Sequence, residues 1–182
     1  MHTGGNPCNP RCARKRKVPN VSNRFEVPAA EYGKWLSTYR WDWWCTLTFR
    51  LPPSPRTSLR HFHRFARTLE HHSGHRPAAF VASESGGIHG REHLHALVRF
   101  PSEAGRLPLL GEGGEFPTGE PRSGWLAFMR TTAWKWWFDS YGRALILDYD
   151  SDKKAAFYLA KYTTKTLAEW DVIGDFEKHE LC

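Results

Sequence analysis

Residues 78–100 read AAFVASESGGIHGREHLHALVRF and predict a β-hairpin. Two runs of apolar and β-branched residues, 78–85 and 93–100, flank a turn signal at Gly86-Gly87, and Pro101 ends the second run. Short apolar runs separated by a glycine-containing turn are typical of paired antiparallel strands. If the turn is centred near His89, Glu84 lies opposite positions 93 and 94 of the neighbouring strand.

The second strand of this hairpin carries His93 and His95. Because side chains alternate along a strand, both imidazoles are expected on one face, with Leu94 on the other. With the carboxylate of Glu84 beside them, they form a donor set that suits Mn²⁺ or Mg²⁺ acting as a Lewis acid. The alternative is that both histidines are solvated on an exposed strand face, since a chain with ten histidines has a fair chance of one such pair.

The patterns on either side extend the hairpin to the order βαββαβ. Strands are predicted over 41–50 (WDWWCTLTFR) and 143–149 (RALILDY, a continuous apolar run), and helices over 31–40, 54–73, 125–141 and 152–169. We therefore expect an α+β fold, an antiparallel sheet of ferredoxin-like or RRM-like (βαββαβ) type with helices packed on it and a C-terminal tyrosine-bearing helix. On the first strand, alternation predicts Trp41 and Trp43 on one face and Trp44 on the other.

The last predicted helix carries a face of phenols and ammonium groups. Tyr158, Lys161, Tyr162 and Lys165 are spaced i, i+3, i+4 and i+7, which places them on one side of a helix. A tyrosine hydroxyl, with a pKa of about 10, is a weak nucleophile, and a nearby cation eases formation of its phenolate. The alternative is an exposed amphipathic helix whose tyrosine rings half-cover the sheet.

Composition and charge point to a polyanionic partner. The chain has 182 residues, 26 Lys plus Arg against 19 Asp plus Glu, and a net charge of +7, which favours nucleic acid or an anionic membrane surface. Nine tryptophans and 14% aromatic residues exceed what a small core needs, and such rings can stack on single-stranded nucleic acid. No transmembrane run and no secretory signal is evident, so we expect an intracellular protein.

The chain is expected to divide into a basic arm and one domain. Residues 1–24 lack hydrophobic periodicity, contain a cluster of positive charges, and are expected to be disordered; residues 25–182 are expected to form the folded domain. The basic residues predicted to contact DNA phosphates are Arg14, Lys15, Arg16 and Lys17.

Three motifs together resemble the HUH endonucleases, specifically the rolling-circle replication initiator (Rep) proteins of plasmids, phages and small single-stranded DNA elements. Residues 45–49 (CTLTF) are similar to the first motif, a threonine-bearing strand. Glu84 with residues 93–95 (HLH) is similar to the second, and residues 158–165 (YLAKYTTK) to the third. The resemblance covers about residues 42 to 167, with the motifs in the family's order.

This resemblance implies a nickase that also rejoins DNA. Glu84, His93 and His95 would hold the divalent ion that polarises a phosphodiester of single-stranded DNA at a replication origin. Tyr158 would attack, giving a covalent 5′-phosphotyrosine and a free 3′-OH primer. Lys161 would stabilise charge.

Other roles implied by the resemblance are less defined. Tyr162 would be either a second nucleophile or a bystander. DNA contacts would fall to Thr46, Thr48, Arg91 and Lys165, besides the basic arm, and a separate host helicase would unwind the template. The alternatives are a transposase of the same superfamily and a noncatalytic RRM-like nucleic-acid-binding module.

Overall fold

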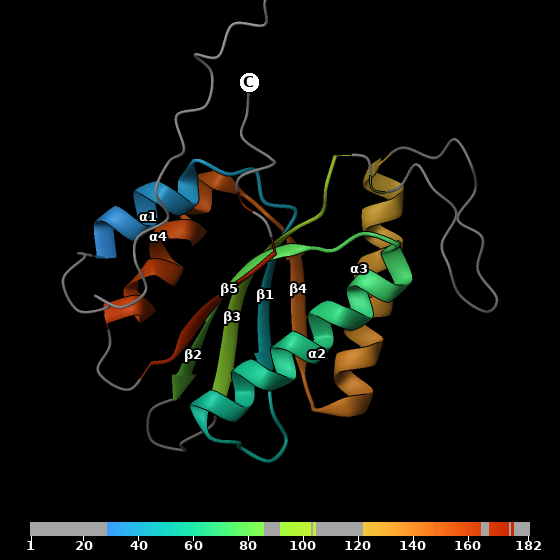
Figure 1. Cartoon of the computed structure of the whole chain (residues 1–182), viewed down its shortest axis with the longest axis horizontal. Coiled ribbons are helices and arrows are strands. Elements are labelled where there is room, and N and C mark those ends of the chain that lie inside the picture. Colours follow the sequence, from blue (N-terminus) through green and yellow to red (C-terminus); the bar gives the residue numbers. More distant parts are fainter. Residues whose placement is uncertain are drawn as a thin grey trace, which may run out of the picture.

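The predicted α+β fold is confirmed by a computed structural model, in which helices cover both faces of a five-stranded antiparallel sheet (Figure 1). The structure describes residues 29–85, 92–102, 104, 122–164, 168–174 and 176. The strands are β1 (Trp43–Thr48), β2 (Ala78–Ser85), β3 (Glu92–Arg99), β4 (Ala144–Asp148) and β5 (Trp170–Ile173). The helices are α1 (Ala29–Ser37), α2 (Pro55–Ser73), α3 (Arg122–Ser140) and α4 (Ala155–Ala160), and 3₁₀ turns Ser151–Lys153 and Lys161–Thr164 flank α4.

The sheet has the strand order β4-β1-β3-β2-β5, with every neighbouring pair antiparallel. The first four strands, with α2 and α3 as crossovers, reproduce the predicted βαββαβ arrangement. The fifth strand was not predicted. It pairs with the edge of β2, where Trp170 stacks on Phe80 with ring centroids 5.6 Å apart.

Two hydrophobic cores lie on opposite faces of the sheet. One packs α2 and α3 against the sheet and includes Trp43, Phe65 and Trp137. The other packs α1 and α4 and includes Leu36 and Leu159. Figure 1 shows these two helix layers on either side of the strands. The sheet face beneath α4 is the one on which the candidate site lies.

Local signals account for the best-defined helix, α2. Ser54 caps its first turn, the Oγ atom accepting a hydrogen bond from the Thr57 amide, and Pro55 occupies the first helical position. Gly74 ends the helix at φ 69°, a left-handed conformation that glycine adopts without steric cost.

Three predictions about individual segments were wrong. The helix predicted over 152–169 is only α4 continued by a 3₁₀ turn, because Lys154, at φ 53°, interrupts it on one side and the chain enters β5 on the other. β4 is not buried on both faces; as an edge strand it leaves Leu145 and Leu147 exposed. Trp41 precedes β1, so alternation does not govern it, and it packs in the core opposite to that of Trp43.

Other predictions fall on residues about which the structure says nothing. The basic arm with Arg14, Lys15, Arg16 and Lys17, and the residues Arg91 and Lys165, lie outside the described residues. Among the described helices, none is long and apolar enough to cross a membrane.

Candidate active site

The register of β1, β3 and β2 brings the predicted metal ligands together. His93 pairs with Glu84 on β2 and with Thr48 on β1, while His95 pairs with Thr46. The hairpin register expected from the sequence is therefore confirmed. The four polar groups share the face opposite to Leu94, which is fully buried in the core under α2 and α3.

Each histidine is held by a threonine of the adjacent strand. Thr46 Oγ1 lies 3.3 Å from His95 Nδ1, and Thr48 Oγ1 lies 3.1 Å from His93 Nδ1. These contacts were not predicted, although the matching T-x-T and H-x-H spacings on two strands are a signal for them. With Nδ1 engaged on both rings, Nε2 is the nitrogen that each ring presents to other partners.

Glu84 contacts one of these Nε2 atoms. Its Oε2 atom lies 3.1 Å from His95 Nε2, and His95 is nearly buried. Within the described part of the chain, no three histidine, cysteine or acidic side chains are already grouped as a metal site. Two imidazoles and a carboxylate on adjoining strands nevertheless fit a divalent cation by donor chemistry.

The two tyrosines differ in their surroundings. Tyr162 is 3% exposed, stacks on His95 with ring centroids 5.0 Å apart, and donates a 2.7 Å hydrogen bond from its hydroxyl to that of Tyr158. Burial, followed by the hydrogen bond to Tyr158 and the nearby Glu84 carboxylate, raises the pKa of Tyr162 well above its usual value. Tyr158 is 43% exposed and meets His95 edge-on.

Lys161 completes the group of predicted residues that the structure brings together. Its Nζ atom lies 5.5 Å from the centroid of the Tyr158 ring, a distance at which an ammonium group is attracted to an aromatic face. The helix is shorter than expected, yet Tyr158, Lys161 and Tyr162 remain neighbours because the 3₁₀ turn Lys161–Thr164 continues directly from α4.

Trp44 is a site residue that the motifs did not identify. Its indole stacks on His95 with centroids 5.5 Å apart and an interplanar angle of 24°, and it contacts Tyr158 edge-on at 5.8 Å. The prediction that it faces away from Trp43 is confirmed, since it shares the site face with Thr46. The alternation of β1 therefore carried the signal, but not the contact.

Comparison with known families places this geometry in context. A family model described as a replication-associated protein, of ORF2 type, matches residues 42–167. The matched segment runs from just before β1 to just after α4, and so contains all the contacts described above. No curated protein and no solved structure matches the chain.

Proposed function

This chain belongs to the ORF2-type family of replication-associated proteins, and on that premise we propose that it initiates replication as an HUH-type nickase, cutting and rejoining single-stranded DNA at an origin through Tyr158. The observation that carries the proposal is the placement of an exposed phenol against a cluster of His95, Glu84 and Tyr162. A weak nucleophile beside groups that hold protons and charge is what phosphoryl transfer to tyrosine requires.

Tyr158 is the better nucleophile of the two tyrosines. Its hydroxyl accepts a hydrogen bond from Tyr162, and a donor aimed at the oxygen on which charge develops stabilises the phenolate. Tyr162 is nearly buried, and its raised pKa disfavours its own phenolate. These contacts support a scheme in which Tyr158 attacks and Tyr162 remains protonated as a donor. Lys161, close to the Tyr158 ring, adds positive charge near the reacting oxygen.

Glu84, His93 and His95 are the residues proposed to hold a divalent cation, Mn²⁺ or Mg²⁺. A histidine that binds a cation through Nε2 carries its proton on Nδ1, and the Thr46 and Thr48 oxygens are placed to accept that proton. The chemistry that such a cation supplies is polarisation of a phosphate oxygen. The threonines act here by orienting the imidazole rings.

The proposed step exchanges one phosphodiester for another. The Tyr158 oxygen forms a bond to phosphorus, the bond from phosphorus to the 3′-oxygen of the preceding nucleotide breaks, and the phenol proton is balanced by the proton gained on the released 3′-OH. The product is a 5′-phosphotyrosine and a primer end. Because the phosphotyrosine conserves the phosphodiester bond, attack by a 3′-OH reverses the step and rejoins the strand without ATP. A separate host helicase would open the template.

The test is formation of a covalent adduct. Full-length protein is incubated with Mn²⁺ and a library of single-stranded oligonucleotides, and adducts that resist SDS are resolved by electrophoresis. We expect adducts with a subset of strands and none with Tyr158→Phe. Absence of any adduct, with strand binding retained, contradicts the nickase and favours a noncatalytic nucleic-acid-binding module. Adducts confined to transposon-end sequences would favour a transposase.

A further inference from the structure

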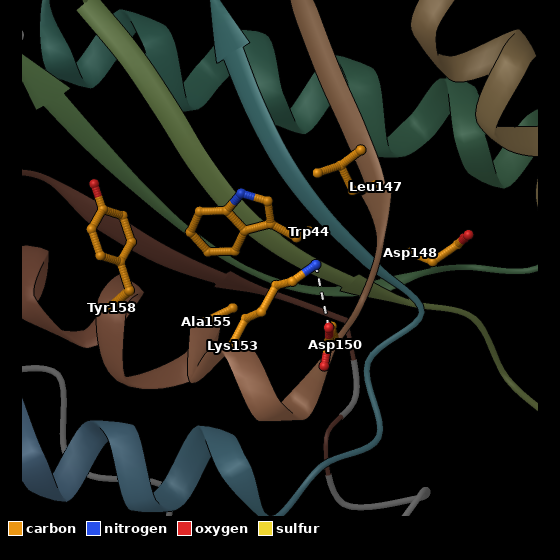
Figure 2. Close-up of a pocket in the computed structure, with 7 residues that line it drawn as sticks. All are labelled: Trp44, Leu147, Asp148, Asp150, Lys153, Ala155 and Tyr158. Carbon is orange, nitrogen blue, oxygen red and sulfur yellow. Dashed lines mark ion pairs between the residues drawn. The ribbon is translucent and has the colours of Figure 1, made fainter.

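A pocket of about 470 Å³ opens beside Tyr158, between the edge strand β4 and the start of α4 (Figure 2). Its lining residues are Trp44, Leu147, Asp148, Asp150, Lys153, Ala155 and Tyr158. Of these, the proposed reaction uses only Tyr158. The pocket therefore requires its own explanation, and its position beside the proposed nucleophile restricts what could occupy it.

The floor of the pocket is apolar. Trp44 and Leu147 are direct partners across the β1–β4 ladder, so their side chains stand next to each other on the site face of the sheet. Leu147 is 45% exposed, although it belongs to a strand of the sheet. In Figure 2 the indole of Trp44 lies between Tyr158 and Leu147. An indole beside an open leucine is a surface suited to a planar ring.

The rim of the pocket offers one hydrogen-bond donor and one acceptor. Lys153 Nζ and Asp150 Oδ2 form an ion pair of 3.3 Å at the mouth, drawn as the dashed line in Figure 2. The Asp148 carboxylate is turned away, because it pairs with Arg130 of α3 on the other side of the sheet at 2.6 Å. The pocket thus presents a balanced pair of charges. A phosphate would meet a carboxylate there, whereas the edge of a neutral base would meet both a donor and an acceptor.

We infer that this pocket binds one unpaired nucleobase of the DNA strand, next to the phosphate that Tyr158 attacks; the inference rests on the proposed function. The base lies against Trp44 and Leu147 and is read at its edge by Asp150 and Lys153. Stacking on an aromatic platform is how proteins hold unpaired bases, and enclosing one base selects the position of the phosphate beside it. The pocket volume is ample for a single base, since it falls within the range of small-molecule sites.

The first experiment measures binding without chemistry. Tyr158→Phe protein is titrated with a fluorescently labelled single strand taken from the library by its tight binding, and with copies in which each base in turn is replaced by an abasic site. We expect one abasic position to weaken binding at least about tenfold. In a Tyr158→Phe/Trp44→Leu protein the intact strand should bind as weakly, and the same abasic position should cost nothing further.

Two further variants separate the pocket from its surroundings. Trp44 also stacks on His95, so Leu147→Glu, which places charge in the pocket without that contact, should lose the same base-specific term. Trp134→Leu is the matched control, because Trp134 is a 43% exposed tryptophan of α3 that does not line the pocket. Asp150→Asn should change which base is preferred at the sensitive position.

The outcomes are distinguishable from those of the adduct assay. If no abasic position matters, or if the abasic and Trp44→Leu losses simply add, the nucleobase pocket is wrong even when adducts form. If a sensitive position exists but maps away from the nick in the wild-type reaction, the placement beside Tyr158 is wrong. If wild type forms no adduct while the coupled loss is present, the nickase fails; the pocket then binds a base, but not beside a phosphate under attack.

Discussion

The hydroxyl of Tyr162 donates a 2.7 Å hydrogen bond to the hydroxyl of Tyr158. Tyr162 lies nearly buried against His95, whereas Tyr158 is open to solvent beside Lys161. Two tyrosines that are equivalent by spacing therefore occupy different environments. The buried one is suited to donating a hydrogen bond, and the exposed one to attacking a phosphate.

Tyr162→Phe should slow adduct formation without abolishing it. The hydrogen bond to a developing phenolate involves a charged group and is worth about 1.5–3 kcal/mol, so we expect a rate about 10- to 100-fold lower. Initial rates of adduct formation measure the effect. Tyr141→Phe is the control, because its hydroxyl contacts His61 on the opposite side of the sheet. A complete loss of adduct with Tyr162→Phe, together with retained adduct in Tyr158→Phe, would reverse the assignment.

Stability at alkaline pH should depend on Tyr162. Its folded-state pKa lies above the unfolded value of about 10, so the folded state holds the proton more tightly and stability is lost as pH rises above about 10. The loss amounts to at most about 1.4 kcal/mol per pH unit. Denaturant unfolding of wild type and Tyr162→Phe at pH 8 and pH 11 checks this. The stability difference between the two proteins should shift in favour of the variant at pH 11, and an unchanged difference would contradict the prediction.

Removing the divalent cation, or one of its proposed ligands, should stop cleavage and spare strand binding. EDTA, His93→Ala, His95→Ala and Glu84→Gln each remove part of the charge that polarises the phosphate. Adduct formation and the dissociation constant of a single strand are measured in parallel. His71→Ala, at the exposed end of α2, serves as the control. Cleavage that persists in EDTA would exclude the metal site.

Replacing Thr46 or Thr48 by valine should weaken cation binding. Valine keeps the shape and the strand preference of threonine but leaves the Nδ1 atoms of His95 and His93 without their hydroxyl partners. Loss of such a supporting contact typically costs about 10- to 100-fold in metal affinity. Calorimetric titration with Mn²⁺ measures it, and the corresponding serine variants should recover most of the affinity. Equal affinities for the valine and serine variants would mean that the hydroxyls have no orienting role.

Gly33→Ala should disturb the tyrosine helix from a distance. A methyl group at Gly33 of α1 would collide with the ring of Phe157, which directly precedes Tyr158 in α4. Overpacking of this kind costs about 1–3 kcal/mol, and we expect a lower unfolding midpoint together with slower adduct formation. Gly74→Ala has a positive φ but meets no neighbouring atom, so it should lower stability and leave the adduct rate unchanged. Equal adduct rates in both variants would show that α4 does not respond to this contact.

Alternation and periodicity were enough to predict much of this molecule. The hairpin, the pairing of Glu84 with His93 and the order βαββαβ all follow from local patterns, because a strand's period of two sets which side chains share a face. The segment after residue 152 escaped the same logic. Its apolar spacing is compatible with one long helix, but the left-handed Lys154 and the pairing of Trp170–Ile173 with β2 make a short helix and a strand instead.

The sequence by itself therefore determined the fold class and the polar groups from which the site is built. Only the tertiary structure decided what those groups touch. Thr46 meets His95 because β1 lies beside β3, a neighbour 49 residues away in the chain, and Trp44 lines a pocket because β4 forms the sheet edge. The unequal roles of Tyr158 and Tyr162 likewise come from burial against His95. Such differences depend on which distant segments pack together, and no local periodicity encodes them.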